Sequence, residues 1–163
     1  MKEFQYKEAS PAELERRWDR NIANNPGDER WVAWRAAIIA DNQSGLIKTF
    51  VVLYGDEPVG EGTLVFSPQC SDLHGRTTLA DGKHTVNISA LRMDQPHRGC
   101  GHMSGLVKHM ERYAKAHSYE TATIGVEAKE ARNLGIYLHW GYDTFIASEV
   151  DDGALVLYYA KKL

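Results

Sequence analysis

One segment of the chain constrains the fold more than any other: an alternating strand that leads through a glycine-containing turn directly into an amphipathic helix. Residues 84–93 alternate polar and apolar side chains, which predicts a half-buried strand. Residues 94–101 form the predicted turn, and the helix that follows carries a single apolar stripe. A half-buried strand and an amphipathic helix must bury their apolar faces against each other, so the segment predicts layered α/β architecture.

The turn itself has the features of an anion site. Gly99 and Gly101 allow positive φ and a close approach of the backbone to a ligand. The first turn of the following helix presents unpaired N–H groups, and Arg98 adds a permanent positive charge next to them. A pyrophosphate fits such a nest, but Gly-x-Gly also occurs in tight turns that bind nothing. Ser104 stands where a dinucleotide fingerprint has its third glycine, which argues against that fingerprint.

The rest of the chain supplies further helices and strands around this unit. Ser10, Pro11 and Glu13 form a capping box that predicts the start of a helix, and Asp28 can cap a second one. Apolar patterning and turn residues then predict strands at 46–54, 59–66, 121–127, 143–149 and 154–160, a long loop at 67–83 and a helix at 131–140. We therefore expect a mixed sheet with helices on both faces.

The composition is that of one globular domain spanning residues 1–163. Hydrophobic residues make up 43% and charged residues 25% of the chain, and the net charge is −3. Without a basic block we expect no nucleic acid partner, and without a long apolar run no membrane span. Two cysteines without metal-ligand spacing favour free thiols and a cytoplasmic setting. His102 and His109 are seven residues apart, unlike zinc-ligand pairs, so we expect no metal.

A second informative segment covers residues 126–142. A strand leads into a short helix that ends at Gly141, and an aromatic residue, Tyr142, follows directly. Tyr137 lies four residues before that glycine. Its hydroxyl is either a core group bonded to a backbone carbonyl or a proton donor.

Together these two segments resemble the GNAT acetyltransferase superfamily. Residues 93–107 look like its acetyl-CoA signature, R/Q-x-x-G-x-G/A, with Arg98 at the first position and Gly101 at the fourth. Residues 137–142 match the Tyr-x-x-x-Gly-Phe/Tyr ending of its second cofactor motif. Two positions depart from the pattern: Met103 replaces the last glycine or alanine, and Glu130 replaces an asparagine, for which Asn133 is a nearby substitute.

The resemblance implies a three-layer GNAT fold, with a twisted, mostly antiparallel mixed sheet between helices. It implies acetyl-CoA, or another acyl-CoA, bound in a gap where the strand before the signature splays from its neighbour. The residues it assigns to the cofactor are Leu91, Arg92, Met93, Arg98, Gly99, Cys100, Gly101, His102, Met103, Ser104, Glu130, Asn133 and Tyr137. In this family a tyrosine at the position of Tyr137 commonly protonates the leaving thiolate.

The acceptor, a primary amine of a small molecule or peptide, is less well specified. The amine must lose a proton, and Glu61, or water held by Asn87 or Ser89, is the candidate base. Trp31 and Trp34 lie on helices that border the acceptor site in the family, where an aromatic wall would suit a cationic amine. Two alternatives stay open: a non-catalytic CoA-binding or interaction module, and an enzyme using a longer acyl-CoA. The C-terminal strands offer an edge for a homodimer.

Overall fold

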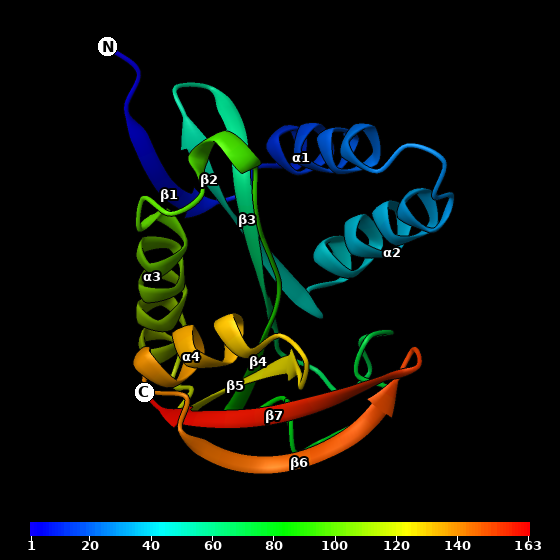
Figure 1. Ribbon diagram of the computed structural model, residues 1–163, viewed down its shortest axis with the longest axis vertical. Helices are drawn as coiled ribbons and strands as arrows, with labels where there is room; N and C mark the ends of the chain where they lie inside the picture. The colour runs from blue at the N-terminus through cyan, green and yellow to red at the C-terminus, as the bar shows by residue number, and fades with distance from the viewer.

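The computed structural model describes all 163 residues (Figure 1). In chain order its elements are β1 (Phe4–Glu8), α1 (Pro11–Asn24), α2 (Arg30–Ser44), β2 (Ile47–Tyr54), β3 (Glu57–Val65), β4 (Thr85–Met93), a short 3₁₀ turn (Gln95–His97), α3 (His102–Ala116), β5 (Thr121–Glu127), α4 (Ala131–His139), β6 (Thr144–Asp151) and β7 (Ala154–Lys162). No helix is long and apolar enough to cross a bilayer.

One sheet of seven strands, in the order β1-β2-β3-β4-β5-β7-β6, organises the molecule. Five of its six pairings are antiparallel and only β4 with β5 is parallel, with α3 as the connection between those two strands. The predicted mixed, mostly antiparallel sheet is confirmed. β6 lies at one edge of the sheet, as the expected dimer edge requires, and the dimer itself stays a prediction.

Helices cover both faces of this sheet, and each face has its own hydrophobic core. One core packs α3 against β2 to β5 and includes Phe50, Leu106 and Met110. The other packs α1 and α2 around Trp18 and Ile38. The fold is therefore the three-layer arrangement that the sequence predicts, with α1 and α2 on one side and α3 on the other (Figure 1).

The capping box at the start of α1 forms as the sequence indicates. The Ser10 hydroxyl accepts a hydrogen bond from the Glu13 amide at 3.2 Å, and the Glu13 carboxylate accepts one from the Ser10 amide at 2.8 Å. These bonds satisfy two groups that the first helical turn leaves unpaired. Asp28 contributes to α2 by accepting from the Arg30 amide at 3.2 Å.

Two features differ from the sequence expectation. Strand β1 was not predicted, because the alternation of Phe4 and Tyr6 with Gln5 and Lys7 is too short to mark a strand by itself. Antiparallel pairing with β2 orders these residues. The segment 67–83 is a loop as predicted, but it is not simply polar. Cys70, Leu73 and Leu79 are buried in the core beneath α1 and α2, so the loop closes that side of the sheet.

Candidate active site

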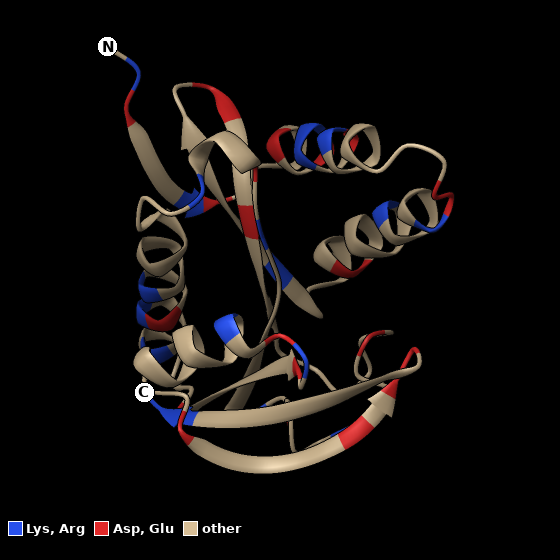
Figure 2. Ribbon diagram, viewed as in Figure 1, with Lys and Arg blue, Asp and Glu red and all other residues tan.

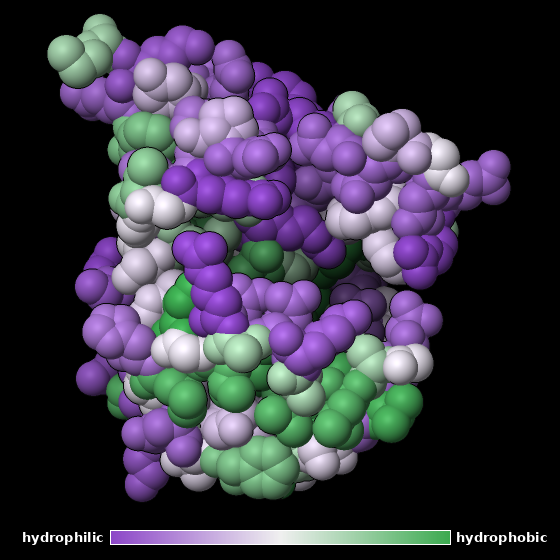
Figure 3. Space-filling model, viewed as in Figure 1, coloured by the Kyte–Doolittle hydropathy of each residue, from purple (hydrophilic) through white to green (hydrophobic).

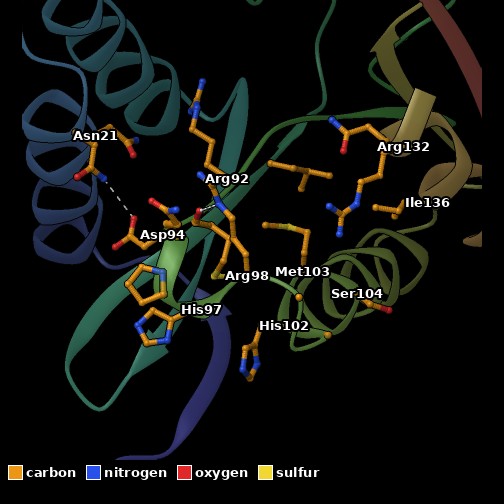
Figure 4. A pocket seen from close by; sticks show the side chains of 18 of the residues that line it. Asn21, Arg92, Asp94, His97, Arg98, His102, Met103, Ser104, Arg132 and Ile136 are labelled. Atoms are coloured by element: carbon orange, nitrogen blue, oxygen red, sulfur yellow. Dashed lines mark hydrogen bonds between the residues drawn. The ribbon is translucent and has the colours of Figure 1, made fainter. Parts of the chain in front are cut away.

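A single large cavity of about 1470 Å³ opens between the two helical layers, at the end of β4. Its walls come from α1, the start of α2, the last residues of β4, the turn before α3, the first turn of α3, and α4. The space-filling view shows the hollow, with a mainly hydrophilic rim above apolar depth (Figure 3), and the close-up shows side chains converging from these elements (Figure 4).

The floor of the cavity is a gap in the sheet between β4 and β5. The two strands pair only from Thr85↔Thr121 to Ile88↔Ile124, whereas β5 continues along β7 as far as Glu127↔Val156. A register shift on the β3 side and positive φ at Ala90 (55°) mark a bulge where β4 turns away. The last residues of β4 consequently lie apart from β5, and Leu91, Arg92 and Met93 line the cavity edge.

The turn that contains Gly99 and Gly101 places the N-terminus of α3, which has no side-chain cap, beside this gap. Gly99 and Gly101 both have positive φ, 74° and 82°, and Gly101 stands at the N-cap position of α3. A glycine cannot cap with a side chain, and the first helical bond runs from the Gly105 amide to the Gly101 carbonyl. The amides of residues 102–104 are thus without helical partners, next to the positive end of the helix dipole.

Neighbouring side chains hold that helix end in place. Arg98 donates from Nε to the carbonyl of Met93 at 2.8 Å, which ties the turn back to the end of β4. His102 stacks on Phe4 with ring centroids 3.7 Å apart, and its Nδ1 lies 3.0 Å from the Tyr6 hydroxyl. The strand that the sequence analysis missed, β1, therefore anchors the start of α3.

Helix α4 forms the opposite wall and carries Tyr137. The Tyr137 ring packs beside Trp140, with centroids 5.5 Å apart, and its hydroxyl makes no hydrogen bond within the protein. Burial, followed by the nearby Glu130 carboxylate, raises the pKa of Tyr137 above its ordinary value. A tyrosine in this position stays protonated at neutral pH and is able to donate its proton into the cavity.

On the α1 side the cavity ends at a buried ionic network. Arg17 donates to Asp94 at 2.7 Å and to Glu61 at 3.3 Å, and Asn21 donates to the same Glu61 oxygen at 2.5 Å. Arg20 also binds Asp94. Burial by itself raises the pKa of Asp94. The hydrogen bonds and charges of the two arginines together outweigh burial, so the pKa of Asp94 lies below its ordinary value. Charge pairing of this kind keeps Asp94 ionised.

The structure assembles most of the predicted site residues around the cavity. Those that line it are Trp31, Leu91, Arg92, Met93, Arg98, Gly99, Gly101, His102, Met103, Ser104, Asn133 and Tyr137. Asn133 lies on the wall while Glu130 does not, which agrees with Asn133 as the substitute at the irregular motif position. Cys100 is exposed on the outside of the turn.

Six predicted residues do not line the cavity: Cys100 and Glu130, and four of those considered for the base and the acceptor. Glu61 is completely buried behind Arg92, and Asn87 is buried against Thr123, to whose hydroxyl it donates at 3.0 Å. Ser89 lies on β4 before the bulge. Trp34 packs edge-on against Trp31 but is 38% exposed, on the outer side of α2.

Several cavity residues could not be found by sequence patterns. Arg17, Arg20 and Asp94 form one network although 74 to 77 residues separate the arginines from the aspartate. A further group on the walls consists of Asn24, Asn25, His97, Arg132, His139 and Trp140. Only Arg17 gave a local signal, since it follows Leu14 and precedes Trp18 on the apolar side of α1.

Comparison with known proteins gives the family. The profile of the acetyltransferase (GNAT) family matches residues 6–142. Among solved structures, an N-acetyltransferase from Staphylococcus aureus is similar, with 16% identity, 98% of each chain covered and a TM-score of 0.68. So is an IAA acetyltransferase from Bacillus cereus, with 14% identity, coverage of 99% of this chain and 100% of that one, and a TM-score of 0.67.

A GNAT family acetyltransferase from Elizabethkingia anophelis, solved with acetyl-CoA bound, is similar at 13% identity, with 98% of each chain covered and a TM-score of 0.63. No curated protein sequence matches the chain significantly. Because the family profile spans most of its length, the chain belongs to the GNAT acetyltransferase family. By that membership it is an acyl-CoA-dependent N-acyltransferase.

Proposed function

We propose that the protein transfers an acetyl group from acetyl-CoA to a primary amine by direct attack, with both substrates bound at once. The observation that carries this is the meeting, in one cavity, of the gap between β4 and β5, the open N-terminus of α3 and the free hydroxyl of Tyr137. The gap can hold the pantetheine arm of the cofactor, the helix N-terminus can bind its phosphates, and the Tyr137 hydroxyl can act as the acid.

The residues at the cavity fit coenzyme A. A Cβ added at Gly99 or Gly101 would meet no atom within 4 Å, so the turn leaves open space above its backbone. Amides 102–104 together with Arg98 can bind the pyrophosphate, with Met103 on the wall beside them. The end of β4, free of β5 from residue 89 onward, supplies backbone groups for the pantetheine arm.

When bound, acetyl-CoA supplies the activated thioester. The protein holds the amine above it from the α1 and α2 side and keeps Tyr137 protonated for the departing sulfur. Glu61 accepts on one oxygen from Arg17, Asn21 and Arg92, and it does not reach the cavity. We therefore assign the amine proton to water in this open cavity, and Glu61 to positioning the arginines.

Two rival functions can be separated from this one by experiment. The purified protein is incubated with acetyl-CoA and a panel of primary amines, and free thiol release is followed together with thermal stability. Thiol release that depends on an amine supports acetyl transfer. Stabilisation by CoA without release from any amine would indicate a binding module, and no stabilisation at all would remove CoA from the proposal.

The acyl chain length is tested in the same assay. Octanoyl-CoA in place of acetyl-CoA should release less thiol, because Leu91 and Met93 occupy the edge of the gap where a longer chain would lie. A faster rate with the longer donor would favour the longer-acyl alternative.

The cytoplasmic setting that the sequence favours stays a prediction.

A further inference from the structure

The cavity is strongly positive although the chain as a whole carries a net charge of −3. Five arginines line it against one carboxylate, Asp94, and the arginines are Arg17, Arg20, Arg92, Arg98 and Arg132. Arg98 lies in the turn before α3 and Arg132 in the first turn of α4, on the side where phosphates of coenzyme A would lie. The other three border the acceptor side and need a separate explanation.

Two of those three arginines are already satisfied within the protein. Arg17 donates to Asp94, Glu61 and the carbonyl of Pro58. Arg20 donates to Asp94 through both Nε and an Nη, and its other Nη lies 3.6 Å from Glu57. Their guanidinium groups have carboxylate partners and little capacity left for a ligand.

Arg92 is different. Its only carboxylate contact is one long bond, from Nη1 to Oε1 of Glu61 at 3.4 Å, and that oxygen also accepts from Arg17 and Asn21. Since a guanidinium has five N–H donors, most of the donors of Arg92 remain available. Arg20 has Glu57 as a further carboxylate neighbour, so Arg92 is the arginine of this group with the weakest carboxylate contact.

Packing holds the free guanidinium in a fixed position. Its central carbon lies 4.9 Å from the ring centroid of Trp31 and 5.3 Å from that of Trp18. Leu91 and Met93, its neighbours on β4, point to the opposite side of the sheet, toward Gly62 and Gly60. The Arg92 side chain is 30% exposed and lies in the cavity between α1 and the glycine turn before α3 (Figure 4).

The aromatic wall considered for a cationic amine is therefore covered by a cation of the protein itself. A second cation at the ring face of Trp31 would meet Arg92 at close range. An acidic group of the acceptor at this wall would meet Arg92 as a partner of opposite charge, with the reacting amine nearer the gap beside β4.

From these contacts we infer that the acceptor is an amine that also bears an acidic group, a carboxylate or a phosphate, and that Arg92 binds this group. This inference rests on the proposed acetyl transfer and names its substrate class. A planar guanidinium fork matches the two oxygens of either group and gives a bond assisted by charge on both sides.

The experiment compares amines that differ only in the acidic group. Each L-amino acid is paired with its carboxamide, and phosphoethanolamine is paired with ethanolamine. Affinity for the CoA-loaded protein is measured by calorimetry, and thiol release from acetyl-CoA is measured in parallel. Because the acidic group also changes the pKa of the amine, rates are expressed per neutral amine.

Three variants locate the effect. Arg92→Gln removes the charge, Arg92→Lys keeps the charge without the fork, and Arg16→Gln is the control, since Arg16 lies exposed on the same helix as Arg17 and away from the cavity. Circular dichroism and thermal unfolding establish that each variant folds.

We expect at least one acidic amine to bind about tenfold or more tightly than its uncharged partner. Arg92→Gln should remove that preference, Arg92→Lys should retain part of it, and Arg16→Gln all of it. A preference for carboxylate over carboxamide, or for phosphate over alcohol, identifies which acidic group Arg92 binds.

The inference is overturned if the uncharged amines bind as well as the acidic ones, or if Arg92→Gln keeps the preference. Either result can occur with thiol release intact, which leaves the proposed acetyl transfer standing. Absence of thiol release from every amine would instead count against the transfer, and calorimetry would still report whether Arg92 binds acidic amines.

Discussion

Burial controls the protonation state of Tyr137, and that state decides what this hydroxyl can do. Desolvation and the neighbouring Glu130 raise its pKa, so the phenol is neutral over the whole physiological range. A neutral phenol on the wall of the cavity can protonate a leaving thiolate but cannot serve as a base. The role that the family resemblance implies is consistent with the position and the protonation state that the structure gives.

Tyr137→Phe should therefore reduce turnover without weakening cofactor binding. Loss of a general acid lowers kcat by about 10²-fold or more, whereas removal of one unbonded hydroxyl costs little packing. Steady-state kinetics gives the first quantity and calorimetry with CoA the second. Turnover equal to that of the wild type would remove Tyr137 from the mechanism, and Tyr159→Phe, on β7 outside the cavity, serves as the control.

Glu61 gives a second test at the scale of one residue. Its carboxylate is held by three donors and is separated from the cavity by Arg92, so it should not take the proton of the amine. Glu61→Gln should leave the pH profile of kcat/KM for an uncharged amine in place, with a rate change below about tenfold. A general base would cost about 10²–10⁴-fold and would remove the acidic limb of the profile.

At the scale of elements, the contact of α3 with β1 fixes the helix end that faces the cavity. Gly105 lies on α3 directly against Tyr6, and a Cβ there would stand 2.6 Å from the ring. To accept it, the Tyr6 ring must move and give up its contact with His102. Gly135, on α4, has no atom within 4 Å of such a Cβ and is a matched helical position.

Gly135→Ala should stabilise the protein by up to about 1 kcal/mol, because alanine has the higher helix propensity. Gly105→Ala should not show this stabilisation, since the forced shift of Tyr6 costs about 1–3 kcal/mol. Urea unfolding of both variants measures the difference. Equal stabilisation of the two would show that β1 yields easily and does not anchor the start of α3.

The elements themselves were predictable where the chain signals them locally. The capping box at Ser10, the glycines before α3 and the alternation in β4 each mark an element by short-range chemistry. β1 has no such mark and depends on pairing with β2. The bulge at Ala90 was expected only by resemblance, because its positive φ is imposed by the register with β3 rather than by a glycine.

The same distinction explains what could be predicted of the site. The turn 98–104 and Tyr137 belong to contiguous motifs, and the structure places both at the cavity. On the acceptor side Arg17 is distant in sequence from Arg92 and Asp94, and the latter two would pass for ordinary surface charges. Only tertiary structure reveals that two of these charges are neutralised and that one is free.

At the scale of the whole molecule, the buried ionic network links the α1 layer to the sheet. Arg17 of α1 reaches Asp94 just after β4 and Glu61 on β3, while Arg20 binds Asp94 from the next turn of the helix. The ribbon marks the basic positions on α1 and the acidic positions on β3 (Figure 2). Arg17 is only 2% exposed, so it depends on these carboxylates remaining ionised. Protonation of Asp94 would leave a buried cation short of a partner.

Asp94→Asn should consequently destabilise the protein by about 3 kcal/mol at pH 7. The pKa of Asp94 is lowered in the folded state from its ordinary 3.8, so its contribution is complete above that value and is lost as the pH falls through the lower, folded value. The wild type should therefore lose stability on acidification below about pH 4, and Asp94→Asn should lose less over the same interval.

Urea unfolding at pH 7 and at several values between pH 4.5 and pH 2.5 measures both effects. Asp19→Asn is the control, because Asp19 pairs with Arg35 at the surface, and such a pair contributes about 1 kcal/mol or less. If Asp94→Asn were as stable as the wild type at pH 7, or equally sensitive to acid, the network would not hold α1 to the sheet. The position of Arg92 at the acceptor wall would then depend on its bond to Glu61 and its stacking against Trp18 and Trp31.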